Sequence, residues 1–374
     1  MISMIIKVIK YLLPYGFIRI IQKFLLLKSS TKNSLQDKNI NIIYGKYYIP
    51  YYNNGTALNS RYPDLYNCEG KKIELFFIRD IHGAHLVYSQ SKYFQYDRYN
   101  FGLDTHFYTH NSMLETMGNP RKKYGMLIES KTIVPEDYEL FKKYPGLEKD
   151  FDLIFTFSDE ILQEIPNSRY VPYYLRPRYL FSDVFQFHGA SFDKKDIFLS
   201  PDRYLQKTKN ISIISSDKEY VPLHKYRKQI AMRCKTNNLA DTYGTFDGGT
   251  YCDISDPFYN YRFSIVIENE ITPYCFTEKI INCFATMTIP VYLGASKIGS
   301  LFNPEGIIQF NIIDDIETIL KKCTKEYYEE KIPAIIENFN KINIDKNADD
   351  IIYENYIVND IGKKSPEELF RMII

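Results

Sequence analysis

Two neighbouring groups of polar residues in the sequence could do chemistry together: Glu268-Asn269 and Thr277-Glu278-Lys279. A lysine beside the free amides of a helix start can bind phosphate, and a carboxylate can bind sugar hydroxyls or face a developing positive charge. The combination therefore suits a sugar attached to a phosphate. Each residue also has a structural explanation: Glu278 would favour the helix dipole, Thr277 would be an N-cap, and Glu268 would be a solvent-facing carboxylate at a strand end.

The sequence around these residues predicts a strand–loop–helix–strand unit, which we interpret as βαβ. Residues 263–267 form an apolar run typical of a buried strand, and residues 289–293 form a second one that Gly294 ends. Ligands of open parallel sheets bind beyond the carboxyl ends of the strands, next to helix N-termini, so both polar groups should lie there. A helix starting near Phe276 is predicted by apolar residues at helical spacing: Ile280, Ile281, Phe284 and Met287.

Three segments within residues 261–294 carry a family resemblance: F-x-I-x-x-E-N, T-E-K-I and I-P-V-Y-L-G. They resemble the donor-binding signature of the α1,3/4-fucosyltransferases, glycosyltransferase family 10, and weaker similarity extends from about residue 123 to residue 310. The resemblance implies a GT-B architecture of the α/β class, in which two Rossmann-like domains face each other across a cleft. It also implies GDP-fucose as the donor and inversion at the anomeric carbon of fucose.

The same resemblance assigns roles to the polar groups. It implies donor binding by Glu268, Asn269, Thr277 and Lys279, and we expect Glu278 or Glu268 to stabilise positive charge on the sugar in the transition state. The family usually has tyrosine two residues before the threonine of T-E-K, where this chain has Cys275.

A neighbour of that cysteine could make the missing contact. Cys275 is flanked by Tyr274 and Phe276. We therefore include Tyr274 as a donor-binding candidate, and the alternative is that donor binding differs in detail.

Residues 124–129 predict another buried strand that ends in a carboxylate, Glu129. In the family, a glutamate at the end of this strand is proposed as the general base, and Glu129 occupies that place in the segment E-S-K-T-I-V-P-E-D-Y. An inverting transferase must remove a proton from the acceptor hydroxyl as its oxygen attacks, which a carboxylate within hydrogen-bonding distance can do. The alternative is a solvent-facing glutamate.

Residues 221–234 predict a helix carrying Arg227. The family has a helix arginine here that contacts the donor phosphate, and Arg227 matches it. Lys225 or Arg233 could instead be the matching residue, and the structural alternative for Arg227 is an arginine on the surface. Ser215, at the end of a strand predicted over 210–215, is a further donor-binding candidate. Because cations can offset diphosphate charge, no metal is expected to be required, and Mg²⁺ or Mn²⁺ would act only as stimulants.

Composition excludes several other classes of protein. The 374 residues suffice for two domains, and a formal net charge of +1 gives no support for nucleic-acid binding. The six cysteines are scattered without a C-x-x-C motif, which argues against a metal knuckle or a disulfide framework and fits a reducing compartment. The string Asp80-Ile81-His82-Gly83-Ala84-His85 has no third cluster of ligands, so we do not predict a metal site there.

Residues 1–28 are apolar and basic, and they contain no acidic residue. The uncharged run is too short for the ~20 residues that a membrane-spanning helix needs. We interpret the segment as basic amphipathic helices on an anionic membrane surface, placing the protein in the cytoplasm, peripherally at the inner face of the membrane. The alternative is an ordinary helix packed on the first domain, and residues 29–41 are a predicted linker.

The predicted domains are an N-terminal acceptor-binding domain (40–190), a C-terminal nucleotide-sugar-binding domain (191–350) and C-terminal helices (351–374). Residues 92–111 are rich in tyrosine and phenylalanine and could line an acceptor groove or simply pack. Further strands are predicted over residues 73–78, 151–157, 169–174, 239–246 and 307–310. Further helices are predicted over residues 135–144, 313–322, 325–339, 351–358 and 366–374.

These features predict a transferase that moves fucose from GDP-fucose to a hydroxyl, O3 of N-acetylglucosamine or glucose, of an oligosaccharide or glycolipid acceptor. The acceptor would be a surface glycan such as a lipopolysaccharide or a glycoprotein. Two alternatives stay open. The chain could be a GT-B transferase that uses another nucleotide sugar, or an inactive glycan- or membrane-binding relative.

Overall fold

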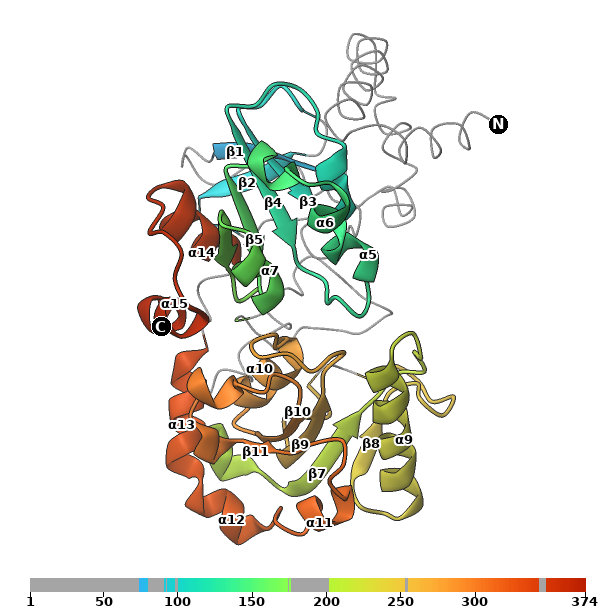
Figure 1. Cartoon of the computed structure of the whole chain (residues 1–374). Helices are drawn as coiled ribbons and strands as arrows, with labels where there is room; N and C mark the ends of the chain where they lie inside the picture. Colours follow the sequence, from blue (N-terminus) through green and yellow to red (C-terminus); the bar gives the residue numbers. More distant parts are fainter. Residues whose placement is uncertain are drawn as a thin grey trace, which may run out of the picture. The chain divides into compact units, whose positions relative to one another are not determined.

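The computed structural model describes residues 74–79, 91, 93–97, 100–173, 175, 202–252, 255–342 and 348–374 (Figure 1). Contacts divide the chain into two compact units. The first holds the described residues up to Glu129, with Val134–Thr156 and Ile161–Arg169. The second holds Ser130–Ile133, Phe157–Glu160 and Tyr170–Ile374. The predicted segments 1–28 and 29–41, the string Asp80–His85 and the predicted domain boundary near residue 190 lie outside the described residues.

The first unit is built on a six-stranded sheet with the order β2-β1-β3-β4-β5-β6. Every pairing from β2 through to β5 is parallel. Strands β1, β3, β4 and β5 are buried over four or more consecutive residues, as expected where both faces of a parallel sheet are covered. The strands are β1 (Glu74–Arg79), β2 (Phe94–Asp97), β3 (Thr105–Thr109), β4 (Lys122–Leu127), β5 (Leu153–Thr156) and β6 (Ser168–Tyr170).

Strands β2 and β3 were not predicted, because they lie in the aromatic-rich run 92–111. Phe94 and Phe107 are fully buried, and their rings stack with centroids 6.1 Å apart. Tyr96 and Tyr108 are also buried. The described rings of this run therefore pack in the core of the first unit, which supports the packing interpretation rather than an acceptor groove.

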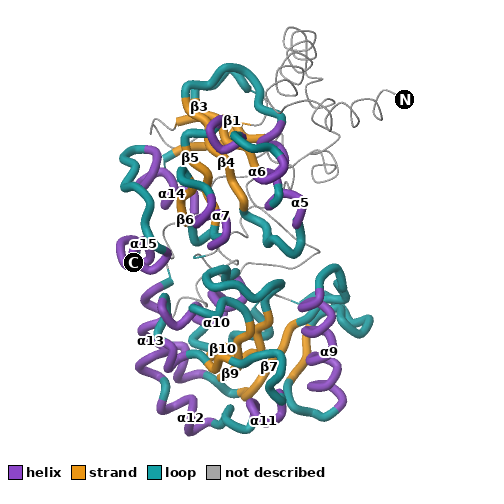
Figure 2. The backbone as a smooth tube through the Cα atoms, in the orientation of Figure 1, coloured by secondary structure: helices purple, strands orange, loops and turns teal. Residues whose placement is uncertain are grey.

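The second unit contains a five-stranded, wholly parallel sheet with the order β11-β10-β9-β7-β8. Figure 2 shows its strands with helix α9 (Pro222–Thr236) on one side and α10 (Glu278–Ala285) on the other. In the centre, β9 pairs with β10 from Phe263↔Ile289 to Ile267↔Leu293, so the predicted βαβ unit is confirmed. The strands are β7 (Lys209–Ile214), β8 (Asp241–Tyr243), β9 (Tyr261–Ile267), β10 (Ile289–Leu293) and β11 (Ile308–Gln309).

Several predicted helices are broken in the structure. The helix predicted over 135–144 is two short helices, α5 (Pro135–Tyr138) and α6 (Leu140–Lys143). The helix predicted over 325–339 divides at Lys331 into α12 (Lys325–Glu330) and α13 (Ile332–Lys341). Pro333 explains this break, because proline lacks an N–H and clashes with the preceding turn, whereas the first turn of a new helix accommodates it.

The remaining helices lie close to their predicted places, apart from α7 (Asp159–Glu164), which was not predicted. The helix predicted over 351–358 begins earlier, as α14 (Ala348–Ile352), and continues as a π-helix over Tyr353–Ile357. None of the described helices has the length and apolar run that crossing a bilayer requires. The others are α11 (Ile316–Leu320) and α15 (Pro366–Ile373), with 3₁₀ turns at His110–Leu114, Leu147–Asp150, Arg203–Gln206, Ile298–Ser300 and Pro304–Gly306.

The two parallel sheets with their helices confirm the predicted α/β class. The facing of two domains across a cleft stays a prediction.

Candidate functional site

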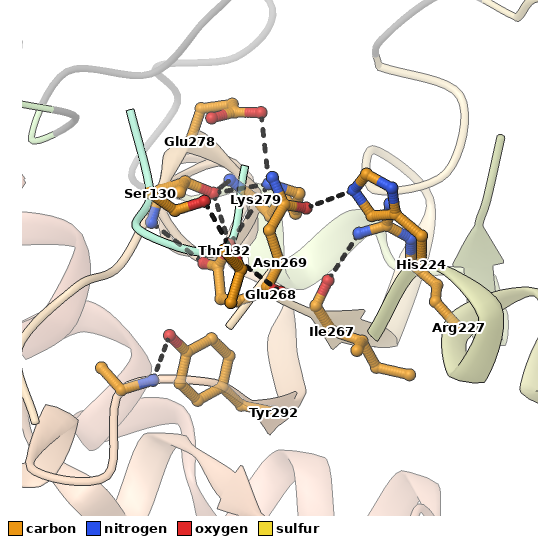
Figure 3. A network of polar contacts seen from close by, with 12 residues as sticks. Ser130, Thr132, His224, Arg227, Ile267, Glu268, Asn269, Glu278, Lys279 and Tyr292 are labelled. Carbon is orange, nitrogen blue, oxygen red and sulfur yellow. Dashed lines mark hydrogen bonds and ion pairs between the residues drawn. The ribbon is translucent and has the colours of Figure 1, made fainter. Parts of the chain in front are cut away.

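Glu268 is the buried centre of a polar cluster in the second unit (Figure 3). It directly follows β9, and its own N–H donates to the carbonyl of Leu293, 2.9 Å away, which ties it to the end of β10. Its Oε1 accepts the N–H of Thr277 at 2.9 Å, and its Oε2 accepts the Thr277 hydroxyl at 2.7 Å and the Lys279 ammonium at 3.2 Å. Both carboxylate oxygens are thus engaged, so the solvent-facing alternative for Glu268 is wrong.

The start of α10 supplies the donors to this carboxylate. Thr277 is the N-cap, and its hydroxyl oxygen accepts the N–H of Lys279 at 3.4 Å and the Lys279 ammonium at 2.8 Å. The ammonium also lies 3.7 Å from Glu278 Oε1. Burial works against the lysine charge, but Glu268 and Glu278 more than offset it and raise the pKa of Lys279 above its usual value. Lys279 is therefore a fixed cation at a helix N-terminus.

The space behind Glu268 is closed by β10. A Cβ atom at Gly294 would lie 2.4 Å from Glu268 Cγ and 2.5 Å from the hydroxyl of Tyr292, so only glycine fits at this close approach. The Tyr292 hydroxyl accepts the N–H of Ala295 at 2.9 Å, and burial raises the pKa of Tyr292 well above its usual value. The glycine read from the sequence as a strand breaker is thus also a packing requirement of the cluster.

Helix α9 contributes a second cation, Arg227. Its Nη1 donates to the carbonyl of Ile267 at 2.7 Å, so the arginine holds the last residue of β9. Burial lowers the pKa of Arg227, and the carboxylates of Glu268 and Glu278 act in the opposite direction. The surface-arginine alternative is wrong, because the residue is only 8% exposed.

One histidine near Arg227 was not predicted. His224 Nε2 lies 3.0 Å from Asn269 Oδ1, and the histidine is only 4% exposed. Its Nδ1 is buried without a hydrogen-bond partner among the described residues. Burial, with a contribution from Arg227, lowers the pKa of His224. The sequence signal was the spacing, since His224 and Arg227 are three residues apart and share one face of the helix.

The segment Ser130–Ile133, which belongs to the second unit, contacts the residue after Asn269. The N–H of Thr132 donates to Glu270 Oε2 at 3.1 Å, and Glu270 is buried. Figure 3 shows Ser130 and Thr132 beside Asn269 and Lys279. Glu270 is a further carboxylate at this strand end that the sequence analysis did not single out.

Tyr274 is engaged elsewhere in the second unit. Its hydroxyl donates to Glu367 Oε1 of α15 at 2.5 Å and accepts from Lys297 Nζ at 3.1 Å. Cys275 is buried, and its N–H donates to the hydroxyl of Thr272 at 2.9 Å. The hydroxyl of Tyr274 thus contacts Glu367 and Lys297, and neither of these residues belongs to the cluster around Glu268.

Ser215 lies just after β7, where it is 2% exposed. Its hydroxyl donates to the carbonyl of Ser216 at 3.2 Å. Gly244, with a φ of +98°, packs so closely that an added Cβ would lie 2.2 Å from the Ser215 carbonyl oxygen. Ser215 is therefore fixed at the edge of the sheet by β8 and the turn that follows it.

Glu129 belongs to the first unit and lies two residues beyond the end of β4. It is partly exposed. Its N–H donates to His110 Nε2 at 3.0 Å, and its carbonyl accepts the hydroxyl of Tyr138 at 2.7 Å. The predicted strand end is therefore correct to within two residues.

The cluster in the second unit balances two carboxylates with two cations. Glu268 has a side chain only 2% exposed, whereas that of Glu278 is 15% exposed and that of Lys279 is 25% exposed. Glu278 and Lys279 can therefore meet a ligand more readily than Glu268 can. Among the described residues, no group of three or more His, Cys, Asp or Glu side chains is arranged to hold a metal ion.

Comparison with known proteins finds structural similarity only. No protein-family model and no curated protein matches the chain. A crystal structure of α1,3-fucosyltransferase is similar at 14% identity and a TM-score of 0.42, covering 71% of this chain and 82% of that one. A crystal structure of α1,3-fucosyltransferase with GDP has 13% identity, a TM-score of 0.44 and the same coverage. One with GDP-fucose has 14% identity and a TM-score of 0.42, covering 78% of this chain and 91% of that one.

Proposed function

We propose that this chain is an inverting glycosyltransferase that moves fucose from GDP-fucose to a hydroxyl of a sugar acceptor. The observation that carries the proposal is the group Glu268, Thr277 and Lys279, interlocked at the carboxyl end of β9 and the N-terminus of α10. Parallel sheets bind phosphorylated ligands at this position, and the residues are those of the fucosyltransferase-like signature in the sequence.

Lys279 would bind the donor diphosphate. Its ammonium is held at 2.8 Å by Thr277 and at 3.2 Å by Glu268, so little reorganisation would be needed when the phosphates arrive. Arg227 would add positive potential from behind the strand end. The dipole of α10 would act in the same direction.

Glu278 is the better candidate for facing the sugar. As the bond from the anomeric carbon to the phosphate oxygen breaks, positive charge develops on the sugar ring, and a nearby carboxylate lowers its energy. Glu268 is surrounded by its own donors, whereas Glu278 is more exposed and lies 3.7 Å from Lys279. In this proposal Glu268 positions Lys279, and Glu278 acts on the sugar.

Glu129 would act as the general base. The acceptor hydroxyl would give its proton to the Glu129 carboxylate while its oxygen forms the new bond to the anomeric carbon. The pair of electrons in the old bond would leave with GDP. We propose no metal or organic cofactor for these steps, with Mg²⁺ or Mn²⁺ at most as stimulants.

Transfer of radiolabelled fucose from GDP-fucose to N-acetyllactosamine or lactose tests this function directly. We expect labelled product together with an equal amount of released GDP. Failure to form product with either acceptor, combined with release of labelled free fucose, would indicate a different acceptor. Absence of both products and of GDP binding would refute the proposal.

A second candidate function is transfer from another nucleotide sugar. The observation that favours it is the altered aromatic position: Cys275 is buried, and the hydroxyl of Tyr274 is engaged by Glu367 and Lys297. Thermal shifts with GDP, UDP and CMP separate the two candidates, because at equal concentration the nucleotide that binds most tightly stabilises the folded state most. Stabilisation by none of the three would favour an inactive glycan- or membrane-binding relative.

We further propose that residues 1–28 bind the anionic surface of the membrane, with the enzyme in the cytoplasm at the inner face of that membrane. The support is the basic, acid-free and apolar sequence of that segment. A membrane-bound acceptor such as a glycolipid would then be near the protein.

A further inference from the structure

A buried pair of side chains, His110 and Asp137, lies directly behind the backbone of Glu129 in the first unit. His110 is completely buried and Asp137 is 5% exposed. The Nδ1 atom of the histidine lies 3.1 Å from Asp137 Oδ2. Its Nε2 atom accepts the N–H of Glu129 at 3.0 Å and that of Ile128 at 3.2 Å.

This pattern assigns the proton on the imidazole. Because Nε2 accepts two N–H groups, the proton of the neutral ring must be on Nδ1. Asp137 lies at 3.1 Å from this nitrogen without the alignment of a hydrogen bond, so its carboxylate favours this form of the ring electrostatically. The ring in turn orients two consecutive backbone amides.

The other side of the Glu129 backbone is held as well. The hydroxyl of Tyr138, which is 1% exposed, donates to the Glu129 carbonyl at 2.7 Å. Tyr138 follows Asp137 in α5, so one short helix supplies both supports. Both backbone polar groups of Glu129 are thus fixed by buried side chains, beyond the point where β4 has ended.

The backbone of His110 is itself unusual. Its φ is +52°, a left-handed conformation that residues other than glycine rarely adopt. Such conformations persist where the surrounding structure requires them, and they cluster at functional sites. The residue begins a 3₁₀ turn in which Ser112 donates to the carbonyls of Thr109 at 2.6 Å and Arg79 at 2.8 Å, so neighbouring contacts hold the turn in place.

We infer that His110, Asp137 and Tyr138 are positioning residues that fix Glu129 as the general base. This inference rests on the proposed function, since it gives Glu129 its role. A general base works only if its carboxylate lies within hydrogen-bonding distance of the hydroxyl of the acceptor sugar. Displacement of the base by about 1 Å can cost ~10²-fold in rate.

The sharpest variant is His110→Asn. Asparagine tolerates positive φ, and its amide nitrogen can take the place of Nδ1 beside Asp137, but it has no atom at the place of Nε2. We expect kcat for fucosyl transfer to fall by ~10²-fold while the KM for GDP-fucose stays within about twofold. His110→Gln places an oxygen near the Nε2 position and should recover part of kcat. Tyr138→Phe should lower kcat less, by ~10-fold.

The matched control is His106→Asn in β3. His106 is also completely buried, but its Nδ1 lies 2.8 Å from the hydroxyl of Tyr108 and not near Glu129. This variant should lose stability and keep its kcat at a temperature where it is folded. Equal losses of kcat in His106→Asn and His110→Asn would show that general loosening of the unit is responsible and would overturn the inference.

Hydrogen exchange of the Glu129 amide provides a readout that does not depend on activity. The amide should be protected in the full-length wild-type protein and should exchange at least ~10-fold faster in His110→Asn, but not in His106→Asn. If the wild type neither transfers nor releases fucose and does not bind GDP, the proposed function fails, while the exchange data still decide whether His110 holds Glu129. If the wild type is active and His110→Asn has both normal kcat and normal exchange, the inference is wrong.

Discussion

Replacing Glu268 by glutamine tests whether this buried carboxylate holds the proposed donor site together. The substitution keeps the size of the side chain but removes the charge that accepts from Thr277 and Lys279. One of its two polar groups becomes an NH₂, which cannot accept the N–H or hydroxyl of Thr277. Removing one partner of a buried ion pair costs about 3–5 kcal/mol, and we expect the lower end because the lysine side chain is 25% exposed.

The loss of stability can be measured as a change in melting temperature. For a unit of this size, 1 kcal/mol corresponds to roughly 2–4 °C, so Glu268→Gln should melt roughly 6–12 °C lower if the unit unfolds in one step. Affinity for GDP should fall as well, because Lys279 would lose the partner that positions it. Isothermal titration with GDP measures this second effect.

Glu278→Gln is the matched control, because this carboxylate lies 3.7 Å from the same ammonium but is more exposed. Glu278→Gln should cost less than about 1 kcal/mol of stability, as the loss of a partly exposed ion pair does. Its main effect should be on kcat, with little change in GDP affinity, whereas Glu268→Gln should weaken GDP binding as well. The double variant Glu268→Gln, Lys279→Met removes both charges and should recover stability relative to Glu268→Gln alone. Equal melting temperatures for the two glutamine variants, or no recovery in the double variant, would refute the reasoning.

Four further predictions concern Glu129, Gly294, His106 and the N-terminal segment 1–28. Glu129→Ala should abolish transfer and leave GDP affinity nearly unchanged; wild-type turnover would contradict its role as base. Gly294→Ala should destabilise the second unit and weaken GDP binding, because its Cβ would lie 2.4 Å from Glu268 Cγ; calorimetry with and without GDP measures both effects. Burial lowers the pKa of His106 from 6.5 to about 4, so unfolded chains bind a proton that the folded protein resists. The contribution of His106 to the free energy of unfolding is complete above pH 6.5 and is lost as the pH falls toward 4, by about 3 kcal/mol in total. Urea unfolding of His106→Phe should therefore show a free energy of unfolding that depends less on pH in this range than that of the wild type. Deletion of residues 1–28 should release the protein from anionic vesicles in a sedimentation assay, and unchanged binding would rule out the membrane-surface interpretation.

The second sheet was the most predictable part of the fold. Its central strands are continuous apolar runs, and the change to helical spacing after Thr277 marks α10 clearly, because local periodicity alone decides these elements. Strands β2 and β3 were not predicted, because a run of aromatic residues is compatible both with a binding groove and with buried strands. Only the pairing of these residues with distant strands distinguishes the two possibilities. The division at Lys331 could have been predicted from Pro333.

The same distinction between local and distant contacts applies to the candidate site. Thr277 and Lys279 are neighbours along one helix start, and Glu268 is only nine residues from Thr277, so their proximity follows from the βαβ unit. The contact of His224 with Asn269 spans 45 residues, and that of Tyr274 with Glu367 spans 93. Neither contact has a sequence pattern of its own. His224 could be suspected only after Arg227 had been placed on the same helix face.

The contacts within the βαβ unit also separate two roles that the sequence left joined. Glu268 and Glu278 were both candidates for stabilising charge on the sugar, because each is an acidic residue beside the same lysine. The two oxygens of Glu268 already accept three hydrogen bonds, so this carboxylate has little capacity left for a ligand. Moving it would also leave the Lys279 ammonium without its buried counter-charge. The side chain of Glu278 is 15% exposed, against 2% for Glu268, so it can meet a ligand more readily. If catalysis requires a carboxylate near the anomeric carbon, the loss of Glu278 should therefore appear in kcat, whereas the loss of Glu268 should appear first in stability and in GDP affinity.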